Sequence, residues 1–83
     1  MTNDKLIAGL KALVAEANAH LDDIRKDLDA AIKREKRATR EGRWDAILCE
    51  RDKISQLLDR EFIHLGRAKT NLARIAELQA EAK

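Results

Sequence analysis

Apolar residues recur at alternating steps of three and four through the first half of the chain. They form a single stripe made of Ile7, Leu10, Val14, Ala17, Leu21, Ile24, Leu28, Ala31 and Ala38. Because an α-helix has 3.6 residues per turn, this spacing places all of these side chains on one face. No proline interrupts the pattern. We therefore predict a long amphipathic helix over about residues 3–40.

A second helix is predicted over about residues 44–81, and its apolar face is wider. Its apolar residues are Trp44, Ile47, Leu48, Ile54, Leu57, Leu58, Phe62, Leu65, Ala68, Leu72, Ile75 and Leu78. At about 100° per residue these positions cover roughly half of the helix circumference. A seam between only two helices needs a narrower stripe. The surplus predicts contact with a further helix, most simply from a second copy of the chain.

Gly42 lies between the two periodic segments and predicts the point where the chain reverses. Glycine adopts positive φ at low cost and often ends a helix. The surrounding residues read Glu41-Gly42-Arg43-Trp44-Asp45-Ala46. This segment resembles the turn of tetratricopeptide repeats, where a glycine precedes an aromatic residue and an alanine. The resemblance implies a turn over residues 41–43, with Trp44 packed on the start of the second helix.

The predicted fold is therefore all-α: a single antiparallel helical hairpin over residues 1–83. Folding at Gly42 pairs apolar residues along its length, including Val14 with Leu72, Leu21 with Leu65, Ile24 with Phe62 and Leu28 with Leu58. We accordingly predict that Leu21, Leu28, Leu58, Leu65 and Leu72 are buried.

A lone hairpin of this length has a thin core and little stability per ordered residue. We expect it to dimerise into a four-helix bundle or coiled coil, which needs only short loops. Several apolar residues flank or widen the predicted seam. The candidate oligomer interface consists of Leu6, Leu13, Ile32, Leu57 and Phe62.

The composition is that of long helices: 45% of residues are hydrophobic and 39% are charged. One Phe, one Trp and no Tyr exclude a core built on aromatic side chains. No apolar run approaches the ~20 residues that a membrane span needs. The single cysteine, Cys49, cannot form an internal disulfide, which fits a reducing compartment. We expect a cytoplasmic protein that does not contact a membrane.

Positive charge is concentrated around the turn, although the formal net charge of the chain is only +2. Residues 33–45 contain six basic and three acidic groups. Cations near a helix C-terminus stabilise the helix dipole, and this accounts for part of the cluster. Arg and Trp are also enriched among interface hot spots. The candidate partner-binding residues are Arg34, Arg37, Arg40, Arg43 and Trp44.

His20 and His64 fall at the same level of the predicted hairpin, on neighbouring helices. With Asp23 or Glu61 they could form a metal site, because helix bundles build such sites from facing helices. The chain lacks the His-x-x-x-His or Glu-x-x-His spacing that supplies two ligands from one face. We therefore expect no metal and no cofactor, and treat a pH-sensitive contact as the alternative.

Other reactive residue types are present without a supporting arrangement. Glu35 and Arg51 fall nearly opposite each other near the turn and predict an ion pair. Cys49 has Glu50 beside it, whereas a reactive thiolate needs positive neighbours, so we predict a small residue at the core boundary. The sequence contains no glycine-rich phosphate loop and no Ser-His-Asp arrangement on a suitable scaffold. We expect no catalytic site.

The leading hypothesis is a small non-enzymatic protein–protein interaction module: an adaptor, inhibitor or co-chaperone. In outline the chain resembles helical-hairpin co-chaperones of bacterial secretion systems and the short accessory proteins by which phages block host machinery. We expect it to bind itself and an unidentified protein, with no small-molecule substrate. A dimeric RNA-binding hairpin that uses the basic turn is the alternative, similar in plan to a regulator of plasmid copy number. A self-assembling structural coiled coil is the third possibility.

Overall fold

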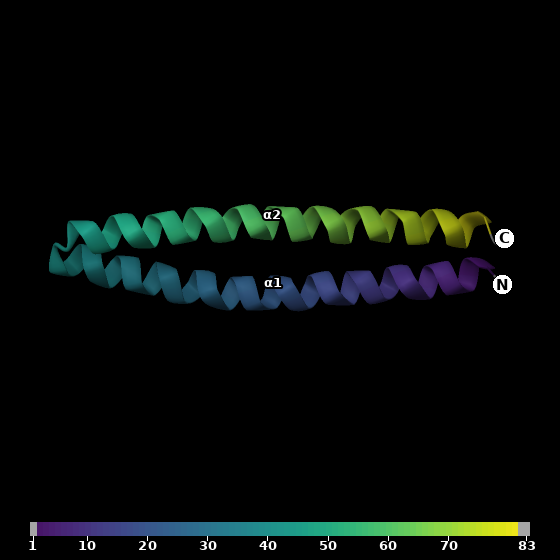
Figure 1. The fold of residues 1–83 in the computed structure, drawn as a ribbon, viewed down its shortest axis with the longest axis horizontal. Helices are drawn as coiled ribbons and strands as arrows, with labels where there is room; N and C mark the ends of the chain where they lie inside the picture. The colour runs from purple at the N-terminus through teal and green to yellow at the C-terminus, as the bar shows by residue number, and fades with distance from the viewer. Residues whose placement is uncertain (1, 82–83) are drawn as a thin grey trace.

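Two long α-helices, α1 (Thr2–Glu41) and α2 (Trp44–Glu81), run antiparallel along their whole length (Figure 1). The computed structural model describes residues 2–81. Its Cα atoms extend over 61 × 14 × 13 Å, with the turn at one end and both ends of the chain at the other. The predicted all-α class, two helices packed against each other, is confirmed.

The turn closes through backbone geometry at Gly42, whose φ is 68°. The N–H of Gly42 donates to the carbonyl of Thr39 at 3.2 Å, and the N–H of Arg43 donates to that of Ala38 at 3.0 Å. These two bonds form the Schellman motif that ends α1. The N–H of Ile47 then donates to the carbonyl of Arg43 at 3.0 Å, at the start of α2. The prediction of a positive-φ glycine at the reversal is confirmed.

The apolar stripe of α1 packs against α2 along a seam, as predicted. Its buried members are Ala17, Leu21, Ile24, Leu28, Ala31 and Ala38. Towards the open end of the hairpin, Ile7, Leu10 and Val14 are half-buried. Leu21, Ile24 and Leu28 fill the middle of this stripe, and Ala17 and Ala31 lie on either side of them.

The seam side of α2 is narrower and more polar than predicted. Its buried or half-buried residues are Ile47, Glu50, Ile54, Leu57, Glu61, His64, Ala68, Asn71, Ile75 and Leu78. These ten positions alternate in steps of three and four, which is the spacing of a single coiled-coil stripe. Four of the ten carry polar side chains. The seam therefore leaves larger apolar residues of α2 elsewhere on its surface.

The prediction that three leucines of α2 are buried is wrong: Leu58, Leu65 and Leu72 are 49%, 43% and 54% exposed. Phe62, predicted to meet Ile24, is 78% exposed. Each lies one residue from a seam position, and one residue is about 100° of helix rotation. Folding at Gly42 paired residues by their level along the hairpin, whereas a rigid helix can turn only one stripe toward its partner. The predictions that Leu21 and Leu28 are buried are confirmed.

Within residues 2–81, neither helix is long and apolar enough to cross a membrane.

Candidate functional site

The seam has two flanks, and contacts between the helices identify each of them. On the first flank Arg51 Nε donates to Glu35 Oε1 at 3.3 Å, which confirms the predicted pair. Leu58, Leu65 and Leu72 follow Arg51 at intervals of seven residues and so share its flank. We call this flank the apolar side. Arg25, which pairs with Glu61 at 3.5 Å, lies on the same flank.

Four exposed apolar residues in the middle and outer part of this flank form what we call the apolar patch: Leu58, Phe62, Leu65 and Leu72. They follow one another by four, three and seven residues, so they make one row along α2. Their exposed fractions, 43% to 78%, are high for large apolar side chains. Contiguous apolar patches beyond a few hundred Å² are uncommon on monomeric proteins and mark interaction sites.

Gly66 lies one turn beyond Phe62 and opens a hollow beside the apolar patch. The hollow has a volume of about 420 Å³ and is lined by Phe62, Ile63, Gly66, Arg67, Thr70 and Asn71, all from α2. A Cβ added to Gly66 would meet nothing within 4 Å. Gly66 is therefore not a point of close approach to α1. An exposed aromatic ring beside a hollow forms a ridge and a groove, and helices pack by placing ridges into grooves.

The structure distributes the predicted oligomer-interface residues over three places. Leu57 is half-buried in the seam. Ile32, 40% exposed, lies one heptad after Arg25 and so shares the apolar side with Phe62. Leu6 and Leu13 are 53% and 50% exposed and lie on the opposite flank. A single partner helix on the apolar patch would not cover these two leucines.

That opposite flank, the histidine side, is identified by His20 and His64, whose rings stack with centroids 4.9 Å apart. The predicted shared level of the two histidines is confirmed. His20 Nε2 also lies 3.8 Å from Glu16 Oε1. Within residues 2–81 no group of three or more His, Cys, Asp or Glu side chains is placed to hold a metal ion. Cys49 is exposed, so its predicted place at the core boundary is wrong.

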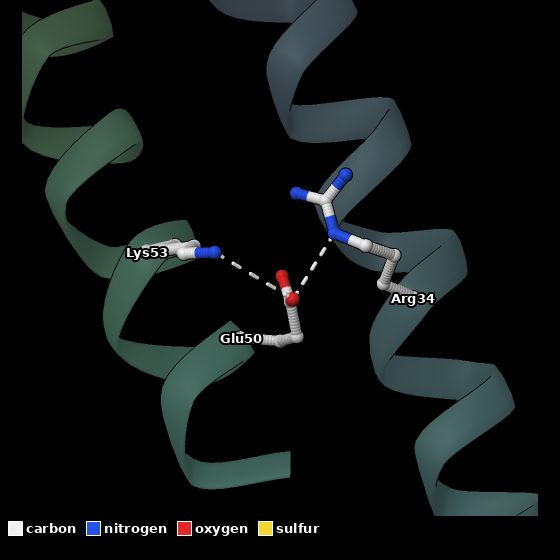
Figure 2. Close-up of polar contacts among 3 residues, drawn as sticks. All are labelled: Arg34, Glu50 and Lys53. Atoms are coloured by element: carbon white, nitrogen blue, oxygen red, sulfur yellow. Dashed lines mark hydrogen bonds and ion pairs between the residues drawn. The ribbon is translucent and has the colours of Figure 1, made fainter. Parts of the chain in front are cut away.

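Within residues 2–81, Glu50 is the buried charged residue, and the sequence reasoning missed it. Figure 2 shows its carboxylate between Arg34 of α1 and Lys53 of α2. Arg34 Nε donates to Oε1 at 3.0 Å, and Lys53 Nζ lies 3.8 Å from the same oxygen. Oε2 is buried without a hydrogen-bond partner. The available signal was its spacing, three residues after Ile47 and four before Ile54.

Internal ion pairs engage three of the four arginines predicted to bind a partner. Arg34 is held by Glu50, and Arg37 and Arg43 both contact Glu41, at 3.1 and 3.5 Å. Arg40 makes no ion pair within the described part of the chain. The structure therefore does not gather the four into one free cluster.

Trp44 is 73% exposed, so its predicted packing on the start of α2 is wrong. The backbone hydrogen bonds at Gly42 and Arg43 close the turn without the indole ring. Trp44 lies seven residues before Arg51, which places it on the apolar side at the turn end of the hairpin. Leu48, 61% exposed, lies one turn further along the same face.

An open groove near the turn brings three cations of the predicted basic cluster together with Arg51 of α2. This tip groove has a volume of about 590 Å³ and is lined by Lys33, Glu35, Lys36, Thr39, Arg40 and Arg51. Lys33 pairs with Asp29 at 3.0 Å, and Arg51 with Glu35. Among residues 2–81, Lys36 and Arg40 have no carboxylate within ion-pair distance. Four cations thus line the groove with one carboxylate.

No protein-family model, curated protein or solved structure matches this chain.

Proposed function

We propose that this protein is a small non-enzymatic protein–protein interaction module of the cytoplasm, which binds helical partners through the apolar patch on α2. One observation carries the proposal. Four large apolar residues form a row on α2 that the hairpin itself leaves 43% to 78% exposed. An adaptor, inhibitor or co-chaperone would use such a row as its docking surface.

Burial of the patch would contribute substantially to binding. Complete burial of a leucine or phenylalanine side chain stabilises a complex by about 1.5–3 kcal/mol. The patch residues retain roughly half or more of their exposure, so each could still contribute about 1 kcal/mol or more.

The first occupant we propose is a second copy of the hairpin. Two copies related by a two-fold axis would place the same patch on both sides of the interface, as in most homodimers. The resulting four-helix bundle would thicken a core that now contains four polar side chains on α2. The same patch, released from the dimer, would be available to a different helical protein.

The test is affinity capture from the native host with matched pairs of variants. Leu58→Glu with Leu65→Glu places two charges in the patch, seven residues apart. Leu6→Glu with Leu13→Glu is the control, because these leucines have the same spacing and similar exposure on the other flank. Helicity of both variants is measured by circular dichroism.

We expect the wild-type and control proteins to retain the same co-purifying proteins, and the patch variant to lose them. Equal retention by all three would contradict the proposed surface. Loss only in the control variant would place the surface at Leu6 and Leu13. If no version retains any protein other than its own copies, the chain is a self-assembling structural segment.

A further inference from the structure

Some of the cations near the turn form ion pairs within the hairpin, and others do not. Arg34, Arg37 and Arg43 are each within 3.5 Å of a carboxylate oxygen. Lys36 and Arg40 lie one turn apart on α1 and have no such partner within residues 2–81. Both line the tip groove, so its uncompensated charge is held where a ligand could enter.

The groove is built as a short positive track. Lys33, Lys36 and Arg40 succeed one another by three and four residues, so they line up along one face of α1. At ~1.5 Å per residue this line is about 10 Å long. Arg51 approaches from α2 and closes the second wall. Thr39 Oγ1 is occupied by a bond to the Glu35 carbonyl at 2.9 Å, so the side-chain charges dominate the groove.

An exposed indole lies on the same side of the hairpin as this track. Trp44 and Arg51 are two helical turns apart on one face of α2, and Trp44 is 73% exposed. Hairpin closure does not use the ring, as described above. A flat aromatic surface beside a row of cations is the arrangement by which proteins hold single-stranded nucleic acids, with bases stacked and phosphates paired.

We propose that the tip groove binds single-stranded nucleic acid, with Lys36, Arg40 and Arg51 on phosphates and Trp44 stacked on a base. A strand fits better than an acidic peptide because every nucleotide supplies both an anion and a flat ring. The site uses none of the residues of the apolar patch. The proposed nucleic-acid site can therefore be tested independently of the proposed protein–protein surface.

The experiment titrates fluorescein-labelled octauridylate into the full-length protein and follows anisotropy at several salt concentrations. Trp44 is the only tryptophan, so its own fluorescence reports stacking of an unlabelled strand. Lys36→Gln with Arg40→Gln removes the two unpaired cations. Lys5→Gln with Lys11→Gln removes the same charge at the far end of α1. An octaglutamate peptide is the probe for a purely acidic ligand.

We expect quenching of Trp44 and a slope of log K against log salt of about −2, as three phosphate contacts on a single strand imply. Removing the two groove cations should reduce the slope by about 1.4 and leave helicity unchanged. Trp44→Leu should weaken binding about tenfold. The control variant should retain the wild-type slope.

Absence of quenching by the strand would overturn the proposal. So would an equal loss in the two double variants, because the protein would then attract anions only through its general charge. Octaglutamate binding as tightly as octauridylate would also overturn it and would identify the groove as a site for an acidic protein segment.

Discussion

The stabilities of Leu21→Ala and Leu65→Ala variants distinguish two orientations of α2 about its own axis: the one in the structure and the one expected from the sequence. The sequence pairs these residues, which predicts a similar cost for both substitutions. In the structure Leu21 is 3% exposed and Leu65 is 43% exposed. The two variants have the same chemical change and the same change in helix propensity, so the difference between them reports burial.

The magnitude follows from the buried groups that each substitution removes. Leu to Ala removes roughly three carbons, at about 0.8 kcal/mol for each buried methylene, and a cavity adds to the loss. For Leu21 this gives about 2–5 kcal/mol of lost stability. Leu65 is about half as well buried, and its loss opens to solvent without forming a cavity. We expect about 1 kcal/mol there.

The assay is urea unfolding followed by helical circular dichroism, analysed by linear extrapolation. Measurements at two protein concentrations separate intrinsic stability from any contribution of association. The free energies of unfolding of the two variants should differ by about 2 kcal/mol in the dilute protein. Equal losses would show that α2 is rotated by one residue from the packing described here. A Leu21→Ala chain that is already unfolded in water, beside a folded Leu65→Ala chain, would agree with the structure.

Three further substitutions test local features. Gly66→Ala should raise stability by about 0.5–1 kcal/mol, because the added Cβ meets nothing within 4 Å and helix propensity improves; an unchanged or lower urea midpoint would contradict this. Gly42→Ala should lower stability by about 1–2 kcal/mol, because φ there is 68°, and a neutral result in the same assay would rule out the described turn. Glu50→Leu should be neutral or stabilise the fold by about 1–2 kcal/mol, because it removes a buried carboxylate of which one oxygen has no hydrogen-bond partner. A thermal melt showing clear destabilisation would mean that its ion pairs outweigh the cost of burial.

The sequence was sufficient for the features that local rules determine. Alternating steps of three and four placed the inner face of α1, and Gly42 placed the turn. The antiparallel alignment followed from these two, which is why Glu35 meets Arg51 and His20 meets His64 as predicted.

The rotation of α2 could not be predicted by choosing large apolar residues. Two neighbouring stripes of α2 have the same three-and-four spacing, and the one that packs on α1 carries Glu50, Glu61, His64 and Asn71. The neighbouring stripe, which contains Phe62, has the larger total volume of apolar side chains. The buried residues Ile47, Ala68, Ile75 and Leu78 nevertheless lie on the seam. Because both stripes run along α2 with the same spacing, continuity alone does not identify the seam or the burial of Glu50.

The candidate sites depended on contacts that the linear sequence does not specify. A count of charges identified the basic turn, but it could not distinguish Arg37, paired with Glu41, from the unpaired Arg40. Lys36 joined the candidate residues only because it shares a groove with Arg51 of the other helix.

Sedimentation equilibrium over micromolar concentrations tests most directly whether the apolar patch of α2 is an association surface. The wild-type chain and the Leu6→Glu, Leu13→Glu control should sediment at about twice the 9.4 kDa of one chain. The Leu58→Glu, Leu65→Glu variant should remain helical and sediment as a single chain. A single-chain mass for the wild-type protein at every concentration would contradict association through the apolar patch. Equal dissociation of both variants would contradict it as well.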